Sequence, residues 1–238
     1  MSAVAAIVRL EGVTKVYGDG QVAVPALRGI DLVIAPGEFT AMAGPSGSGK
    51  STLLNLVGGL DRATAGRVEV DGKDLGRLGA AALSRLRRDR LGFVFQSFNL
   101  IPVLTALENA EYVLMLQGAP LRERRERVRA LLAEVGLGGL EDRFPRELSG
   151  GQQQRVAIAR AIVSEPALVL ADEPTANVDS VTGGALLDLM HGLHETKGIT
   201  FLFSTHDRTV MTRAARLLRL KDGRIVADGR PADVVDAG

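Results

Sequence analysis

The chain of 238 residues contains no cysteine, which excludes disulfide bonds and metal sites built on thiolate ligands and fits a reducing cytosol. It also has little net charge, because 29 basic and 28 acidic residues leave +1. This balance gives no indication that nucleic acid is the main partner. With 46% hydrophobic and 24% charged residues, the composition is that of a soluble globular protein large enough to bury a substantial core.

Long apolar runs are missing as well. The longest stretch without a charged residue, Leu91–Leu107, is too short and too polar to cross a bilayer. The first residues, Met1–Arg9, lack a basic segment followed by a long apolar core, so we expect no signal peptide. If the protein acts at a membrane, another chain must supply the spanning segment.

Residues 44–51 read Gly-Pro-Ser-Gly-Ser-Gly-Lys-Ser and match the phosphate-binding loop pattern G-x-x-x-x-G-K-[ST] at every position. The glycines let the backbone turn tightly enough to aim its N–H groups at phosphate oxygens. Lys50 adds a positive charge for the β- and γ-phosphates, and the Ser51 hydroxyl is placed to ligate Mg²⁺. Apolar residues on both sides put the loop between a strand and the N-terminus of a helix, which also favours anions. A glycine-rich turn without a ligand is the alternative interpretation.

Three regions differ in their expected secondary structure. Residues 1–76 are strand-rich, residues 98–148 are mostly helical, and helices and strands alternate from Gly150 onward. Alternation of strands and helices predicts a mostly parallel sheet covered on both faces, into which the helical middle is inserted as a subdomain. The expected strands are 7–13, 27–35, 39–43, 67–70, 91–95, 167–171 and 199–204, and the expected helices are 122–135, 152–164 and 180–196.

Two carboxylates follow the apolar strand expected at 167–171. Ligands of such sheets bind at the carboxyl ends of strands, so Asp172 is placed to hold Mg²⁺ through water. Strand alternation turns Glu173 the other way, where it can polarise an attacking water. An ordinary exposed turn before Pro174 is the alternative.

A second anion-binding helix start is expected at Leu-Ser-Gly-Gly-Gln, residues 148–152. Ser149 can cap the helix, and Gly150 and Gly151 remove side chains so that backbone N–H groups can approach an anion. The chain therefore combines two helix starts suited to phosphate with a carboxylate pair at a strand end.

The order of the motifs is more specific than any one of them. The phosphate loop is followed by Gln96 after a strand, by residues 148–152, by the Asp172-Glu173 pair and by Ser-Thr-His-Asp at 204–207. In this order they resemble the ATP-binding cassette (ABC) ATPases over nearly the whole chain.

The resemblance implies a fold and a division of the chain. The fold is an α/β P-loop NTPase cassette with a RecA-like, mostly parallel core, an N-terminal antiparallel β-subdomain and an inserted α-helical subdomain. Residues 1–97 and 149–238 would form the nucleotide-binding core with the β-subdomain. Residues 98–148 would form the helical subdomain that contacts a permease.

The resemblance also implies how ATP is bound and hydrolysed. Two copies would meet head to tail, with ATP between the phosphate loop of one and Ser149-Gly150-Gly151 of the other. Tyr17 would stack on adenine, Gln96 would touch Mg²⁺ or the attacking water, and His206 would contact the γ-phosphate. Lys50, Mg²⁺ and backbone dipoles would stabilise the charge that develops during in-line attack by water.

Some of these residues have plainer alternatives. Tyr17 can be a strand-end aromatic, Gln96 a surface polar residue and His206 a structural histidine. Asp179 falls at the family's subunit-bridging aspartate, but Ala-Asn-Val before it departs from the commoner Ser-Ala-Leu, which leaves the contacts of Asn177 and Val178 open.

The candidate residues form three sets. The candidate catalytic residues are Glu173, His206, Gln96 and Lys50. The candidate nucleotide-binding residues are Tyr17, Gly44, Ser46, Gly47, Gly49, Lys50, Ser51, Thr52, Ser149, Gly150, Gly151, Gln152 and Asp179. The candidate magnesium ligands are Ser51, Gln96 and Asp172.

Within the family, the sequence of residues 97–109, 148–155 and 171–179 most resembles that of the ATPases of lipoprotein-releasing, macrolide-efflux and cell-division systems (LolD, MacB and FtsE types). That subgroup implies a homodimer around two Mg-ATP, driving a separate integral-membrane permease from the cytoplasmic face of the cell membrane, with no nucleic acid partner. A solute-importer ATPase and a non-transporting regulator of the cell-division type are alternatives. A soluble ABC ATPase acting on DNA or ribosomes is disfavoured, because the chain has no room for the usual coiled-coil insertion, zinc module or second cassette.

Three segments expected at the surface lie outside these motifs. In the family, residues 97–109 lie where the helical subdomain grips the permease, and packing of the subdomain core would account for about half of their apolar side chains. The basic stretches 85–90 and 122–127 are expected to be solvated helix faces, and the mixed signs of the second favour intrahelical ion pairs. Contact with anionic lipid headgroups is a minor alternative.

Overall fold

The computed structural model describes residues 6–235, so residues Met1–Ala5, which bear on the signal-peptide interpretation, lie outside the described residues. The chain divides into two compact units, residues 1–87 with 200–238 and residues 88–199, which are described separately. The division expected from the sequence, with a helical subdomain at 98–148, comes from the family resemblance and not from contacts within the chain. It stays a prediction.

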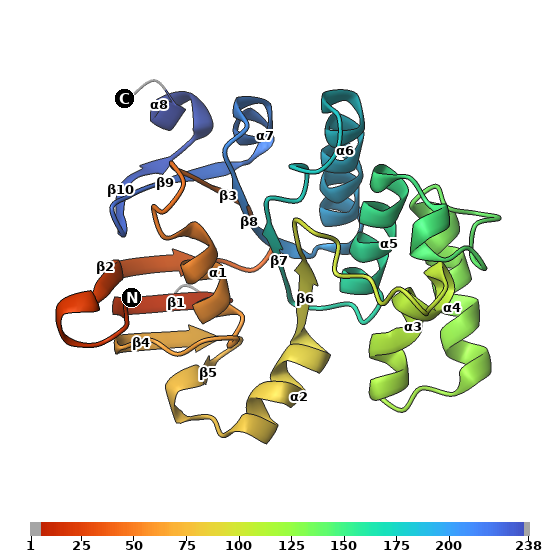
Figure 1. Ribbon diagram of the computed structural model, residues 1–238, viewed down its shortest axis with the longest axis horizontal. Coiled ribbons are helices and arrows are strands. Elements are labelled where there is room, and N and C mark those ends of the chain that lie inside the picture. The colour runs from red at the N-terminus through yellow and green to blue at the C-terminus, as the bar shows by residue number, and fades with distance from the viewer. Residues whose placement is uncertain (1–5, 236–238) are drawn as a thin grey trace. The chain divides into compact units, whose positions relative to one another are not determined.

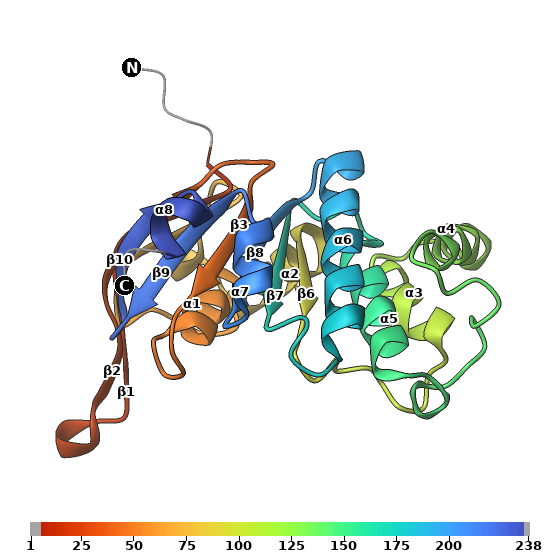
Figure 2. The same cartoon turned by 90° about the horizontal axis from the view of Figure 1, so that it is seen from above.

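The first unit contains a four-stranded antiparallel sheet in the order β2-β1-β4-β5 (Figure 1). The expected strand-rich start of the chain is therefore confirmed. Between β4 and β5, Asp71 and Gly72 have φ of 49° and 71°, the left-handed pair typical of a two-residue hairpin turn. The strands are β1 (Val8–Tyr17), β2 (Val24–Ile34), β4 (Ala65–Val70) and β5 (Lys73–Asp74). Figure 2 shows the far ends of β1 and β2 extending beyond the rest of this sheet.

Four further strands of the same unit lie side by side in the order β10-β9-β3-β8. β3 runs parallel to β8 and to β9, whereas β10 is antiparallel to β9. β3 and β8 are buried along their whole length, as expected for parallel strands covered on both faces. The strands are β3 (Phe39–Ala43), β8 (Thr200–Thr205), β9 (Arg216–Lys221) and β10 (Arg224–Gly229).

The β9–β10 hairpin was not predicted, although its turn carries a recognisable signal. Asp222 and Gly223 join the two strands with φ of 50° and 75°, the same left-handed pair as between β4 and β5. The helical elements of this unit are α1 (Lys50–Val57), α7 (Arg208–Arg213), α8 (Pro231–Val235) and the 3-10 turns η1 (Gly20–Val22) and η2 (Leu75–Arg77). Helix α2 (Ala80–Arg90) continues the chain to the second unit.

The second unit combines a pair of parallel strands with four helices. β6 (Leu91–Val94) pairs with β7 (Leu168–Asp172), and Val94 lies opposite Ala171. Helix α3 contacts both α4 and α5, and α5 contacts β6 and α6 (Figures 1 and 2). The helical elements are α3 (Ala106–Leu116), α4 (Leu121–Glu134), η3 (Pro145–Glu147), α5 (Gly150–Ile162) and α6 (Ser180–Lys197).

A glycine sets the close packing of α5 on β6. A Cβ atom on Gly92 would lie 2.3 Å from the carbonyl oxygen of Ala161, far inside contact distance. The glycine therefore lets the strand approach the helix backbone, which fixes the depth at which α5 sits on the strands.

The solvated-face interpretation of residues 122–127 is partly wrong. The expected intrahelical pair exists, because Arg122 Nε lies 3.0 Å from Glu126 Oε1. Arg124 instead turns inward, where its Nε lies 3.1 Å from Oε2 of Glu111, whose side chain is only 7% exposed. A buried carboxylate is stable only when it is paired with a hydrogen-bonded cation, and Arg124 of the basic stretch supplies this cation to Glu111.

The apolar segment 97–109 splits as expected between core and surface. Ala106 and Leu107 are buried, whereas Val103 is 75% exposed. Asn109 is also buried, and its amide binds the backbone of Ile101 and Leu104, which fixes the segment before α3. Among residues 6–235, no helix is long and apolar enough to cross a lipid bilayer.

The core of the first unit predicts a large stability effect at Phe203. Its ring is fully buried, 4.9 Å from the ring of Phe39. Replacing it by alanine removes these contacts and leaves a cavity, so Phe203→Ala should lower the free energy of unfolding by about 3–5 kcal/mol in urea denaturation. Val226→Ala, at an exposed position on β10, is the control and should change it by less than about 0.5 kcal/mol. Equal effects of the two substitutions would contradict this core.

Candidate functional site

The phosphate-binding loop joins β3 to α1, as its sequence context predicts. Its first and last glycines cannot be replaced without a clash. A Cβ atom on Gly44, whose φ is 156°, would lie 2.2 Å from the carbonyl oxygen of Leu220, and one on Gly49, whose φ is 104°, would lie 2.8 Å from that of Ala26. The surrounding backbone thus enforces the narrow turn that an anion-binding loop needs.

The loop holds a cation and leaves donors open. Lys50 is 8% exposed, and its Nζ donates to the carbonyl oxygens of Gly44, at 2.7 Å, and Pro45, at 3.1 Å. Among the described residues, the N–H groups of Gly47 and Gly49 have no hydrogen-bond partner. An anion seated in this loop would therefore meet both a positive charge and unpaired backbone donors.

The β9–β10 turn supports the loop from outside. Gly223 N donates to the carbonyl oxygen of Ser48 at 3.1 Å, and the Gly223 carbonyl accepts from Arg28 N at 2.8 Å. This turn therefore links the phosphate loop to β2. The motif-based reasoning missed this supporting role, because it examined only the residues of the loop itself.

His206 lies beside the start of the loop. Ala43 at the end of β3 faces Thr205 at the end of β8, so the next residues, Gly44 and His206, leave the sheet as neighbours. Asp207 fixes the following turn by accepting from Thr209 N at 2.7 Å. A cavity of about 320 Å³ opens here, lined by Ala43, Gly44, Pro45, His206, Arg208, Met211, Leu217, Arg219 and Val234. The structure thus brings two of the predicted phosphate-contacting elements together.

Tyr17 ends β1 with its side chain partly exposed. The residue is 41% exposed, and its hydroxyl donates to Asp61 Oδ2 at 2.9 Å. The ammonium of Lys15 lies 4.7 Å from the centroid of the ring. The ring is therefore accessible for stacking and anchored at its polar end.

In the second unit, Gln96, Asp172 and Glu173 lie at or just beyond the ends of two paired strands. β7 ends at Asp172, and Glu173 has a left-handed backbone with φ of 48°. The expectation that strand alternation sets the direction of Glu173 is therefore wrong, since the residue lies outside the strand in a conformation that non-glycine residues rarely adopt.

Helix α5 supports the turn at Glu173. The fully buried amide of Gln154 donates from Nε2 to the carbonyl oxygen of Pro174 at 2.5 Å. The Glu173 carbonyl accepts from Ala176 N at 3.1 Å, which closes the turn. A strained backbone persists where its surroundings hold it, and these two bonds hold the position of Glu173.

Ser149 caps α5 as the sequence predicts. Its hydroxyl accepts from Gln152 N at 3.3 Å, and Gln152 Oε1 accepts from Ser149 N at 2.9 Å. The glycines allow close packing against α6 and the loop before it. A Cβ atom on Gly151 would lie 2.5 Å from Cγ2 of Thr182 in α6, and one on Gly150 would lie 3.4 Å from the carbonyl oxygen of Asn177 in the loop.

Asp179 and Asn177 have defined contacts within the chain. The Asp179 carboxylate caps α6 by accepting from Thr182 N at 3.0 Å, and hydrogen bonds from Thr182 hold its pKa below the usual value. Asn177 Nδ2 donates to the carbonyl oxygen of Gln96 at 2.9 Å. Asn177, which departs from the commoner family sequence, therefore supplies an amide that holds the backbone at Gln96.

Arg160 was missed by the motif-based reasoning. Its guanidinium donates to the carbonyl oxygens of Asn99, at 2.6 Å, and Phe98, at 2.8 Å, two successive residues with left-handed φ of 48° and 60°. Burial lowers the pKa of Arg160 below its ordinary value. An arginine within the apolar run of residues 156–162 is the sequence signal that could have revealed it. It fixes the loop that follows Gln96.

Comparison with known proteins places these features in a family. A family model described as ABC transporter matches residues 27–176. The lipoprotein-releasing system ATP-binding protein LolD of Anaeromyxobacter dehalogenans is 51% identical over 223 residues, covering 93% of each chain. The macrolide export ATP-binding/permease protein MacB of Brucella melitensis is 47% identical over 230 residues, 97% of this chain but only 35% of that protein. The chain thus spans about a third of the length of its MacB relatives.

A solved structure agrees with the fold. The dimeric, post-hydrolysis ATP-binding cassette MJ0796 bound to ADP and Pi is 44% identical, with a TM-score of 0.87 over 94% of this chain and 98% of that one. The expected α/β cassette fold is therefore confirmed.

The contacts of Arg160 predict local protection of the loop after Gln96. Arg160→Met removes both charge-assisted hydrogen bonds, so the backbone amides of Phe98 and Asn99 should exchange with deuterium about ten- to a hundredfold faster. Hydrogen exchange followed by mass spectrometry of a peptide covering these residues measures the change. Arg129→Met, on the exposed face of α4, is the control and should leave that peptide unaffected. Unchanged protection in Arg160→Met would show that the loop is held by other contacts.

Proposed function

This chain belongs to the ABC transporter family, and we propose that it is the ATP-hydrolysing subunit of a membrane complex whose spanning segments lie in a separate permease. The observation that carries this proposal is the phosphate loop. Its end glycines admit no side chain, Lys50 is held within it, and His206 leaves the sheet beside it. A loop of this construction suits the triphosphate of ATP.

Residues of the first unit would bind the nucleotide. The loop from Gly44 to Ser51 would surround the phosphates with backbone N–H groups, with Ser46 and Thr52 as further contacts. Lys50 would leave its carbonyl partners for the β- and γ-phosphates. His206 would hold the γ-phosphate, and the exposed ring of Tyr17 would stack on adenine.

Residues of the second unit would act on the attacking water. Glu173 would orient this water and accept its proton, and the bond from Gln154 to Pro174 would hold the carboxylate in place. Gln96 would contact the same water, with its backbone fixed by Asn177. Positioning and electrostatic stabilisation account for most of the catalysis in phosphoryl transfer, so these supporting bonds matter to the rate.

The donor types of three candidate residues would suit a magnesium ion. Ser51, Gln96 and Asp172 offer a hydroxyl, an amide and a carboxylate oxygen, the hard donors that Mg²⁺ prefers, with phosphate oxygens and waters as the remaining ligands. When bound, the ion neutralises charge on the phosphates. The contribution of this chain is to present oxygen donors at a strand end and at the start of α1.

Two copies would complete each ATP site. Ser149, Gly150 and Gly151 open α5 with a full capping box and would present backbone N–H groups to the γ-phosphate bound by the other copy. Asp179 would contact the other copy. The similarity to a dimeric cassette with ADP and Pi supports this arrangement.

Residues 98–148 would contact the permease. Large apolar side chains are exposed here on α3, on α4 and before α3; they are Val103, Tyr112, Met115, Leu116 and Leu121. Tyr112, Met115 and Leu116 share one face of α3 by helical spacing, and such a face favours burial against another protein. This contact would place the chain at the cytoplasmic face of the cell membrane. The similarity to LolD and MacB favours a permease of the lipoprotein-release or macrolide-export type, with a solute importer or a cell-division regulator as the other candidates.

The proposed role of Glu173 predicts binding without turnover. Glu173→Gln keeps the size of the side chain but removes its basicity, so ATP should still bind while steady-state hydrolysis falls by about 10²–10⁴-fold. Phosphate release and a nucleotide titration measure the two quantities. Lys50→Ala is the contrasting variant and should lose tight binding itself. Turnover at the original rate in Glu173→Gln would remove Glu173 from the reaction.

The proposed partner predicts a specific capture. Tagged Glu173→Gln, incubated with detergent-solubilised membranes and Mg-ATP, should retain a permease that mass spectrometry identifies. A permease with few spans and a large extracytoplasmic domain is expected, whereas a multi-span importer permease would support solute uptake instead. Recovery of soluble or nucleic-acid-bound partners alone would contradict the membrane complex.

The exposed face supplies the control for this capture. Adding Met115→Glu and Leu116→Glu to the tagged Glu173→Gln protein should reduce recovery of the permease and leave ATP binding unchanged. Val226→Glu, at a similarly exposed apolar position of the other unit, should leave recovery of the permease unchanged.

A further inference from the structure

One carboxylate at the end of the phosphate-loop helix contacts the aromatic side chain at the end of β1. After α1 ends at Val57, the chain turns back, and the N–H groups of Leu60 and Asp61 both donate to the carbonyl oxygen of Asn55, at 2.9 and 3.3 Å. Asp61 therefore has a fixed backbone position relative to the helix that begins at Lys50.

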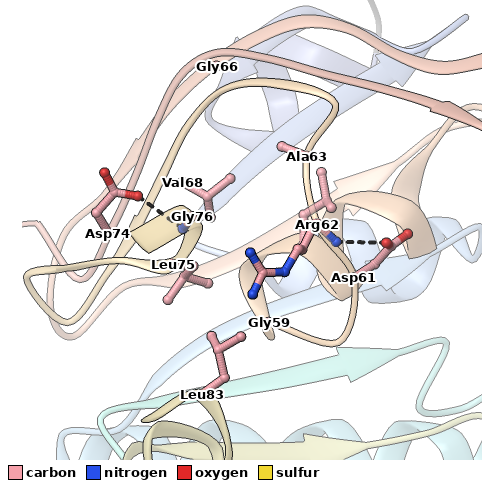
Figure 3. Close-up of a pocket in the computed structure, with 11 residues that line it drawn as sticks. Gly59, Asp61, Arg62, Ala63, Gly66, Val68, Asp74, Leu75, Gly76 and Leu83 are labelled. Carbon is pink, nitrogen blue, oxygen red and sulfur yellow. Dashed lines mark hydrogen bonds between the residues drawn. The ribbon is translucent and has the colours of Figure 1, made fainter. Parts of the chain in front are cut away.

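Both oxygens of Asp61 are occupied. Oδ2 accepts from the hydroxyl of Tyr17 at 2.9 Å, and Oδ1 accepts from Lys15 Nζ at 2.7 Å. Oδ1 also accepts from the N–H of Arg62 at 2.7 Å (Figure 3). Burial opposes the ionisation of Asp61, but the bonds from Lys15, Arg62 and Tyr17 together hold its pKa below the usual value, so it accepts these bonds as a carboxylate at neutral pH.

The same carboxylate sets a cation on one face of the Tyr17 ring. Lys15 Nζ donates to Asp61 and, at 2.9 Å, to the carbonyl oxygen of Arg62, and its side chain is only 12% exposed. From this position the ammonium lies over the ring, 4.7 Å from its centroid. A base that stacks on Tyr17 must then use the opposite face, because the ammonium occupies the first.

The contacts of Asp61 do more than attach the turn to the strand. The backbone is already attached by Thr64, whose N–H donates to the Thr14 carbonyl at 2.9 Å and whose hydroxyl accepts from Val16 N at 3.0 Å. On another side the turn borders a cavity of about 150 Å³, with Leu75 and Leu83 in its wall (Figure 3). The Asp61 side chain is therefore directed to Tyr17 and Lys15 by polar contacts.

We propose that Asp61 is a positioning residue for the adenine base, which fixes the Tyr17 ring by its hydroxyl and holds Lys15 against one face so that the base stacks on the other. The proposal rests on the proposed stacking role of Tyr17. It also gives α1 a second function. The helix begins at the phosphate loop, and the turn that follows it carries Asp61, which orients the Tyr17 ring. A ring fixed in this way loses less conformational freedom when the base binds.

Steady-state hydrolysis of ATP tests this proposal. Asp61→Asn should raise KM for ATP about three- to tenfold with kcat unchanged, and Tyr17→Ala about tenfold or more. Because Asp61 acts through Tyr17, Asp61→Asn should add no further increase in a Tyr17→Ala background. Inorganic triphosphate, a competitor without a base, should inhibit wild type and Asp61→Asn with the same inhibition constant.

Two further variants separate positioning from structure. Tyr17→Phe keeps the ring and leaves Lys15 on Asp61 but loses the hydroxyl bond, so it should raise KM by no more than Asp61→Asn does. Asp74→Asn, in the wall of the same cavity without contact to Tyr17, should leave KM unchanged. A Tyr17→Ala effect without an Asp61→Asn effect would overturn the positioning role alone. An equal loss of triphosphate binding in Asp61→Asn would assign the residue to general stability, and an unchanged KM in Tyr17→Ala would overturn the stacking role and the positioning role together.

Discussion

Parallel pairing of short, buried strands is the constraint on which the candidate site depends. In one unit Ala43 lies opposite Thr205, and in the other Val94 lies opposite Ala171. Each pair therefore releases two loops at the same edge of its sheet. A shift of one residue in either register would offset the ends of the paired strands and move the two loops apart. Burial of β3, β7 and β8 thus determines where the proposed catalytic residues leave the strands.

Helix α5 organises the loops of the second unit through polar side chains on a largely buried helix. Gln154 binds the turn after Glu173, and Arg160 binds the loop after Gln96. Polar groups in such positions are destabilising unless their partners are present, so the loops must adopt one arrangement for the helix to pack. The first turn of α5 is expected to face the nucleotide of a second copy. The same helix is thereby attached to both proposed catalytic loops of its own chain.

The first unit uses a similar arrangement on a smaller scale. The turn after α1 carries Asp61, and the β9–β10 turn carries Gly223. Both turns bind segments that are distant in sequence, the end of β1 in one case and the phosphate loop in the other. Tyr17, proposed to stack on the base, and the phosphate loop thus depend on short turns whose own sequences show no catalytic motif.

The sequence by itself determined the family, the positions of the motifs and most elements of the fold. Apolar runs and turn residues are local signals, so strand Phe39–Ala43 and the Ser149 cap agree with their predictions. Tertiary structure decided the left-handed backbone of Glu173, the inward turn of Arg124, and the supporting contacts of Asp61, Gln154, Arg160 and Gly223. These features depend on partners far away in the chain, because a buried carbonyl, carboxylate or cation is satisfied by whichever group the packing brings to it. Local sequence patterns do not contain that information.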